Sequence, residues 1–159
     1  MKLTVRTVLD ASAQRIWDEV RKPGLLNYVA APMQVFEPLE PATLPEFWTE
    51  GKYLVRLWFL GLLPLGKQWI VICFPEKEQH ARGEYKLRDL GHGDLTTNWD
   101  HVITIKARPD GRTDYSDEVE IRAGLMMAAV WCFAWAFYHH RQRRWRRLVA
   151  AGFDYRGSR

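Results

Sequence analysis

The chain has 159 residues, a length typical of one domain with one hydrophobic core, and we expect residues 1–159 to form a single domain. A hydrophobic content of 47%, with eight Trp, seven Phe and six Tyr, excludes an intrinsically disordered chain. The net charge is +4, but five positive charges come from one arginine cluster. The rest of the chain is nearly neutral, which argues against a basic protein that spreads over a nucleic acid. The cluster consists of Arg141, Arg143, Arg144, Arg146 and Arg147.

The sequence suggests a cytoplasmic protein. Its N-terminus, MKLTVRTVLD, lacks the long apolar stretch and the cleavage site of a signal peptide. Cys73 and Cys132 lie in apolar runs without metal-ligand spacing, and we interpret them as small buried thiols of a reducing compartment. Residues 123–138 are uncharged but cover only about 24 Å as a helix, less than the ~30 Å of a bilayer core. We therefore interpret this run as the first half of a long soluble helix.

The first 50 residues predict two strands and two short helices. β-branched residues favour an initial strand, and Ser12 is placed to cap the first helix. Prolines mark the end of the second helix and a later surface loop. The predicted elements are a strand over 2–9, a helix over 13–21, a short helix ending before Pro32, a strand over Met33–Glu37 and a loop over Pro38–Glu50.

Five further strands and one long helix complete the chain. The strands show alternating apolar and polar residues, and turn signals separate them at Gly61–Gly66, Pro75–His80, Gly91–Asp94 and Pro109–Gly111. They are expected over Gly51–Leu60, Lys67–Phe74, Ala81–Asp89, Leu95–Ala107 and Asp114–Arg122, followed by a helix from about Ala123 to Ala150. No repeat or linker divides this order.

The register of the last two strands can also be predicted. Side chains alternate between the two faces of a strand, so a one-residue slip would move the apolar residues to the outer face. With this slip excluded, a three-residue loop over Pro109–Gly111 sets Ile105 opposite Tyr115. The same register makes His101 and Asp117 diagonal neighbours on the inner face. On the outer face it sets Lys106 opposite Asp114, where we expect an opposite-charge pair.

This order of elements resembles the helix-grip fold of the START-like superfamily, also called SRPBCC, which includes polyketide cyclases and birch-pollen-allergen-like proteins. The residues that carry the resemblance are Leu9–Val20, the short helix through Asn27-Tyr28, and the long final helix. The resemblance implies an α+β fold with a curved seven-stranded antiparallel sheet, two short helices and one long C-terminal helix. It also implies a hydrophobic cavity between the sheet and that helix, which different members use for lipids, sterols, quinones or polyketides.

We therefore expect a protein that binds a small hydrophobic molecule without a metal or another cofactor. Aromatic and aliphatic side chains on the inner face supply apolar area, while Tyr and Trp polar atoms orient a ligand. The same side chains alternatively fill the core, and for each single residue that interpretation has the greater weight. The predicted ligand-binding residues are Tyr53, Val55, Leu57, Tyr85, Leu87, Trp99, His101, Ile103, Tyr115, Asp117, Val119, Met127 and Trp131.

His101 and Asp117 are the polar pair of this inner face. A histidine oriented by a carboxylate can act as a general acid or base, which makes a cyclase or dehydratase-like enzyme the alternative function. The pair is alternatively a structural hydrogen bond or an anchor for a ligand head group, and we rank both of these above catalysis. The remaining histidines lack the arrangement of a metal site.

The final helix leaves a third function open, an interaction module at a membrane or partner surface. Met126, Phe133 and Trp135 lie away from the stripe of apolar residues expected to face the sheet, so they need a second cover: the proline-rich loop, the partner of a homodimer or a membrane surface. The arginine cluster suits an anionic membrane, although solvated arginines near a helix C-terminus are commoner. A specific nucleic-acid partner is not expected. The apolar Gly61–Gly66 turn is interpreted as a cavity lid or as a membrane contact.

Overall fold

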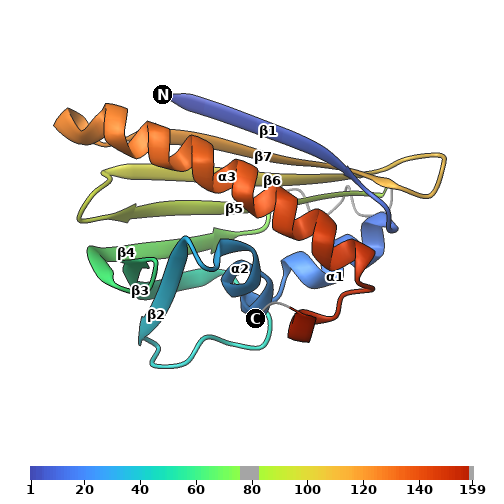
Figure 1. Cartoon of the computed structure of the whole chain (residues 1–159), viewed down its shortest axis with the longest axis horizontal. Helices are drawn as coiled ribbons and strands as arrows, with labels where there is room; N and C mark the ends of the chain where they lie inside the picture. Colours follow the sequence, from blue (N-terminus) through green and yellow to red (C-terminus); the bar gives the residue numbers. More distant parts are fainter. Residues whose placement is uncertain (76–82, 158–159) are drawn as a thin grey trace.

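A seven-stranded antiparallel sheet, curved around one long helix, forms the protein (Figure 1). The structure is a computed structural model, and it describes residues 1–75 and 83–157. Neighbouring strands follow the order β1-β7-β6-β5-β4-β3-β2. The strands are β1 (Lys2–Leu9), β2 (Gln34–Glu40), β3 (Gly51–Phe59), β4 (Leu63–Cys73), β5 (Glu84–Gly93), β6 (Asn98–Ala107) and β7 (Thr113–Arg122).

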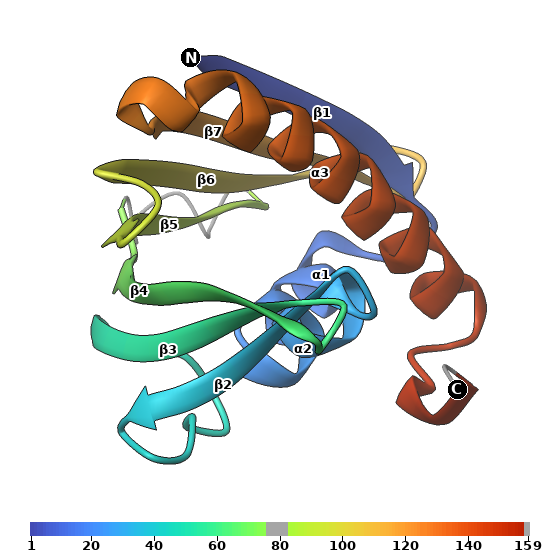
Figure 2. The same cartoon turned by 60° about the vertical axis from the view of Figure 1, so that its left-hand side comes forward.

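Two short helices and one long helix cover the concave side of the sheet in the described residues. These are α1 (Ala13–Val20), α2 (Pro23–Ala30) and α3 (Met127–Ala150), which a short 3-10 turn over Gly124–Met126 precedes. Figure 2 shows α3 running across the sheet, with α1 and α2 beside its C-terminal half. The α+β helix-grip architecture expected from the sequence is confirmed. Within the part of the chain that the structure describes, none of the helices has the length and apolar character needed to cross a bilayer.

Local sequence explains the start of the helical segment. The Ser12 side chain accepts a hydrogen bond from the Arg15 amide, as expected of an N-cap. Pro23 occupies the first position of α2, where its missing N–H costs no hydrogen bond. The buried faces of both helices continue the core of the sheet through Ile16, Val20 and Leu25.

The predicted register of β6 and β7 is confirmed. Ile105 lies opposite Tyr115, and Ile103 lies opposite Asp117. Lys106 does lie opposite Asp114, but the expected ion pair between them is wrong. The Lys106 ammonium lies 3.3 Å from Glu84 on β5, and Asp114 accepts a hydrogen bond from Arg108 instead.

Several predicted boundaries are wrong because glycines and prolines were interpreted as turns. β2 continues through Pro38 to Glu40. β4 begins at Leu63, inside the predicted Gly61–Gly66 turn, and pairs with β3 through a bulge. β5 continues to Gly93, whereas β6 begins only at Asn98. The predicted turn Pro75–His80 and the start of the predicted strand at Ala81 lie outside the described residues, apart from Pro75.

Polar side chains hold the C-terminal half of α3 in place. His140 donates to the Ala31 carbonyl at 2.8 Å, Gln142 to the Val5 carbonyl at 2.7 Å, and Arg144 to the Tyr28 carbonyl at 2.8 Å. The N-terminal half of α3 packs instead through apolar side chains such as Phe133, whose ring lies 6.1 Å from that of Phe59. The helix is therefore anchored unevenly along its length.

Candidate functional site

A cavity of about 340 Å³ lies between the sheet and α3. Three turns of the helix contribute to its lining, from Ala129 to Arg141, a length of about 18 Å. Aromatic rings of α3 and β3 face it, among them Phe59, Phe133 and Phe137. The volume falls at the small end of the roughly 300–1,000 Å³ that ligand pockets occupy. The space is therefore large enough for a small organic molecule.

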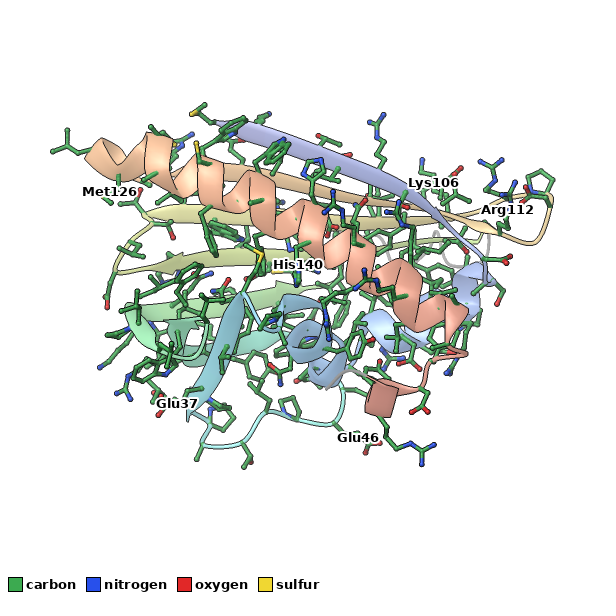
Figure 3. The ribbon with its side chains drawn as sticks, viewed as in Figure 1. Glu37, Glu46, Lys106, Arg112, Met126 and His140 are labelled. Atoms are coloured by element: carbon green, nitrogen blue, oxygen red, sulfur yellow. The ribbon has the colours of Figure 1, made fainter. Side chains whose placement is uncertain are left out.

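The two ends of this cavity differ in exposure. Leu95 is 40% exposed and Ala129 is exposed, and both contribute to the lining at one end. At the other end His101 and Arg141 are buried. Met126 lies just before the N-terminus of α3, near the exposed end of the cavity, whereas His140 lies near the middle of α3 (Figure 3). The cavity thus has an open end, where Gln68 and Thr96 join the apolar lining, and a closed end that holds its charged side chains.

Asp117 on β7 is the centre of the buried polar groups next to the closed end. Its carboxylate accepts hydrogen bonds from His101 Nε2 at 2.8 Å, Gln142 Nε2 at 3.1 Å and the Tyr115 hydroxyl at 3.3 Å. Burial pushes the pKa of Asp117 up, but the Arg141 charge and these hydrogen bonds outweigh it, so the pKa lies below its ordinary value. Asp117 is therefore an ionised carboxylate whose acceptor positions are largely filled.

His101 on β6 forms part of the cavity wall. Burial lowers the pKa of its ring, although the bond to Asp117 opposes this effect. The ring is therefore neutral near pH 7. Because Asp117 is ionised, Nε2 carries the proton of that hydrogen bond and Nδ1 is the acceptor nitrogen. The Tyr138 ring packs edge-on against His101 with 5.0 Å between centroids and fixes its orientation.

Asp89 and Arg141 bring two further charged groups to the closed end. Asp89 Oδ1 accepts a hydrogen bond from the Val71 amide at 2.7 Å. Burial raises the pKa of Asp89 to about 7, against the opposing effects of this bond and of Arg141. Arg141 lies 3.7 Å from Asp117 Oδ1, beyond ordinary hydrogen-bond distance, and its guanidinium stacks 5.2 Å from the centre of the Tyr138 ring.

The predicted ligand-binding residues fall into two groups. Leu57, Trp99 and His101 line the cavity. The others lie outside its lining, and most of them are buried in the core beside it. Asp117 accepts the hydrogen bond of His101 without lining the cavity itself. Met127 and Trp131 are only partly buried. The core residues of this second group are Tyr53, Val55, Tyr85, Leu87, Ile103, Tyr115 and Val119. A direct role of any of them in binding stays a prediction.

Sequence reasoning missed Asp89, Arg141 and Phe133 as cavity residues. Asp89 has the same strand parity as Tyr85 and Leu87, which was the signal for an inward side chain. Arg141 follows Phe137 by one helical turn and is only 6% exposed, so it does not belong to a solvated cluster. Phe133 was expected to lie away from the sheet and instead lines the cavity.

Three of the remaining arginines are exposed as expected, whereas Arg144 and the two cysteines differ from expectation. Arg143, Arg146 and Arg147 are exposed, whereas Arg144 is partly buried against Tyr28. Cys132 is exposed and not buried as predicted, because its position on α3 faces away from the sheet. Met126 and Trp135 are about half exposed.

No family model and no curated protein matches the sequence. Solved structures do match the fold over almost its whole length. A START superfamily protein from Mycobacterium smegmatis has a TM-score of 0.59 and 16% identity, with 94% of this chain and 97% of that chain covered. The Zhui aromatase/cyclase from Streptomyces sp. R1128 has a TM-score of 0.58 and 13% identity, with 96% and 93% covered.

A third solved structure is that of truncated norcoclaurine synthase from Thalictrum flavum. It has a TM-score of 0.57 and 15% identity, and the alignment covers 94% of this chain and 92% of that chain. Identities this low establish the fold alone. The three matches agree with the strand order and the long terminal helix described above. The chain therefore has the helix-grip fold of the START-like, or SRPBCC, superfamily.

Proposed function

We propose that the protein binds a small hydrophobic molecule, of the lipid, quinone, sterol or polyketide kind, in the cavity between the sheet and α3. The observation that carries this proposal is a space of about 340 Å³ lined mainly by aromatic and aliphatic side chains, with the charged residues Asp89 and Arg141 at its closed end. Burial of apolar ligand surface supplies about 25 cal/mol per Å². The polar end fixes the orientation of the ligand.

Native mass spectrometry of the purified chain, followed by organic extraction, tests this function. We expect a retained small molecule, or saturable binding of the neutral fluorophore N-phenyl-1-naphthylamine after extraction. Ala129→Phe places a ring at the cavity lining and is expected to weaken fluorophore binding at least tenfold. Ala128→Phe makes the same change at the adjacent exposed position outside the lining and serves as the control. Equal binding by both variants contradicts the proposal.

An acid–base enzyme of the cyclase or dehydratase kind is the second candidate. The 2.8 Å bond between His101 and the ionised Asp117 favours it, because it leaves Nδ1 of a neutral imidazole as a free base at the cavity wall. The test is turnover of an aromatic polyketide or a ketone across pH. A pH-dependent rate that His101→Ala abolishes, with fluorophore affinity retained, supports the enzyme, and absence of turnover by the wild type contradicts it.

Contact with a membrane and formation of a homodimer remain separate proposals. The exposed Arg143, Arg146 and Arg147 support contact with anionic lipid, and the exposed Leu62 and Leu63 support an apolar contact. Sedimentation with phosphatidylserine vesicles that disappears in the triple Arg→Gln variant supports the membrane contact, and sedimentation unchanged in that variant contradicts it. The same native mass spectra report the assembly state and so test the dimer.

A further inference from the structure

The closed end of the cavity presents hydrogen-bond donors. Arg141 carries five N–H groups, and its interactions with Asp117 and with the Tyr115 hydroxyl satisfy only part of them. Asp117 cannot turn fully toward Arg141 because His101, Gln142 and Tyr115 already occupy its oxygens. Since Arg141 lines the cavity and is 6% exposed, its remaining donors are available to a bound molecule.

Asp89 faces the same space from the sheet. It lies directly opposite His101 on the neighbouring strand, and its Oδ1 is held by the Val71 amide. The groups around it are Arg141 and Tyr138 from α3, His101 on β6, and Asp100 on the other face of β6. With a pKa raised to about 7 by burial, Asp89 is substantially protonated near neutral pH. Its second oxygen can then donate a hydrogen bond.

Below about pH 7, where Asp89 is mainly protonated, the charges at this end sum to zero before any ligand enters. Arg141 and Asp117 compensate each other, His101 is neutral, and protonated Asp89 adds no charge. A buried carboxylate or ammonium would leave a net charge in a site of low polarity, which is costly. An uncharged oxygen acceptor uses the free donors without that cost.

We propose that Arg141 and Asp89 form a head-group subsite that takes an uncharged oxygen acceptor, such as a ketone or quinone carbonyl, at the closed end of the cavity. The apolar body of the ligand then extends along Phe137 and Phe133 toward Ala129 and Leu95. This inference rests on the proposed binding function, because it names the chemistry of the ligand for the same cavity.

The experiment compares four naphthalenes of similar size by isothermal titration calorimetry with the full chain: 2-acetylnaphthalene, 2-ethylnaphthalene, 2-naphthoate and 2-(aminomethyl)naphthalene. At pH 6 the ketone is expected to bind at least tenfold more tightly than each of the other three. Between pH 6 and pH 9 the advantage of the ketone over 2-ethylnaphthalene should decrease, because ionised Asp89 no longer donates. The affinity of 2-ethylnaphthalene should stay constant over the same range.

Two variants separate the subsite from general effects on the fold. Asp89→Asn keeps the oxygen for Val71 and supplies an amide donor at every pH, so the preference for the ketone should persist at pH 9. Arg141→Met should remove most of that preference. Asp114→Asn makes the same substitution on an exposed aspartate outside the cavity lining and should behave as the wild type.

The outcomes distinguish the two proposals. Equal binding of the ketone and 2-ethylnaphthalene overturns the subsite and leaves the binding function intact. If the naphthoate or the amine binds more tightly than the ketone, the subsite proposal is also overturned, because the closed end then accepts an ion. If none of the four compounds binds, the cavity does not take ligands of this size, and the proposed function fails together with the subsite.

Discussion

Asp89 and His101 lie directly opposite each other on β5 and β6, and both side chains line the cavity. Burial acts on them in opposite directions: it raises the pKa of Asp89 to about 7 and lowers the pKa of His101. At pH 7, His101 is therefore mainly neutral and Asp89 is about half protonated, and Asp89 becomes largely neutral as the pH falls below 7. An acid and a base that are both neutral can share the wall of an apolar cavity at lower cost than an ion pair.

Asp89→Asn is expected to change how stability depends on pH. The pKa of Asp89 is about 7 in the folded chain and close to 3.9 when unfolded, so the folded state binds more protons between these values. The contribution of Asp89 to the free energy of unfolding of the wild type therefore falls as the pH rises from about 4 to about 7. The variant lacks this loss and should be more stable than the wild type by about 1–3 kcal/mol at pH 8.5, with little difference at pH 4.5.

Urea denaturation of both proteins at the two pH values measures this difference. Subtracting wild type from variant removes the opposite contribution of His101, whose lowered pKa makes stability fall as the pH decreases below about 6.5. A difference that does not grow with pH would show that Asp89 is ionised in the folded chain at ordinary pH. Asp114→Asn, on an exposed residue, provides the control.

Asp117→Asn should destabilise the fold strongly. The amide cannot accept all the hydrogen bonds from His101, Gln142 and Tyr115, and it leaves the buried Arg141 without its carboxylate. Removing one partner of a buried charge pair costs about 3–5 kcal/mol. Glu118→Gln, on the exposed face of the same strand, should stay within about 0.5 kcal/mol of wild type in urea denaturation. Similar urea midpoints for the Asp117 and Glu118 variants would contradict the role of Asp117 as the ionised centre of the buried polar groups.

Gly93→Ala and Gly24→Ala should have opposite effects. A Cβ at Gly93 would lie 2.3 Å from the Lys67 carbonyl oxygen and 2.9 Å from Gln68 Cα, so the end of β5 would have to move away from the middle of β4. Overpacking of this kind costs typically about 1–3 kcal/mol. Gly24 is in α2 with nothing within 4 Å of the added carbon, and alanine there should add about 0.5–1 kcal/mol. Thermal melts check both predictions: the melting temperature should fall for Gly93→Ala and rise for Gly24→Ala.

Tyr155→Phe should loosen the C-terminal segment. The Tyr155 hydroxyl donates to Glu19, a carboxylate that is 1% exposed and also pairs with Arg15 and Lys22. Loss of a hydrogen bond to a charged group should cost about 1.5–3 kcal/mol. Asp154→Asn, which alters only an exposed pair with Arg156, should change stability little in the same melts. A Tyr155→Phe variant as stable as Asp154→Asn would contradict this role.

The sequence was sufficient for the order of elements and for the pairing of β6 with β7. A period of two and the three-residue loop over Pro109–Gly111 leave one register that keeps both apolar faces inside, and that register brings His101 beside Asp117. The strand limits near Gly66 and Gly93 could not be predicted in this way. Glycine at Gly93 serves close approach to the Lys67 carbonyl within the sheet, which the sequence alone does not distinguish from a turn.

The polar end of the cavity was predicted only in part. Asp89 and Arg141 follow the same periodicities as their apolar neighbours, but charged residues are usually exposed, and that expectation outweighed the pattern. Their burial depends on how α3 lies over the sheet, with Arg141 stacked on the ring of Tyr138. Such packing between distant segments also fixes the volume of the cavity and is not encoded in local spacing.

The uneven anchoring of α3 determines where the cavity can open. His140, Gln142 and Arg144 tie the C-terminal half of the helix to backbone carbonyls, so moving that half would break one buried and two partly buried hydrogen bonds. The turns around Ala129 are held by apolar contacts and border the exposed end. If a ligand enters this cavity as proposed, we expect the N-terminal turns of α3, and not its C-terminal half, to separate from the sheet.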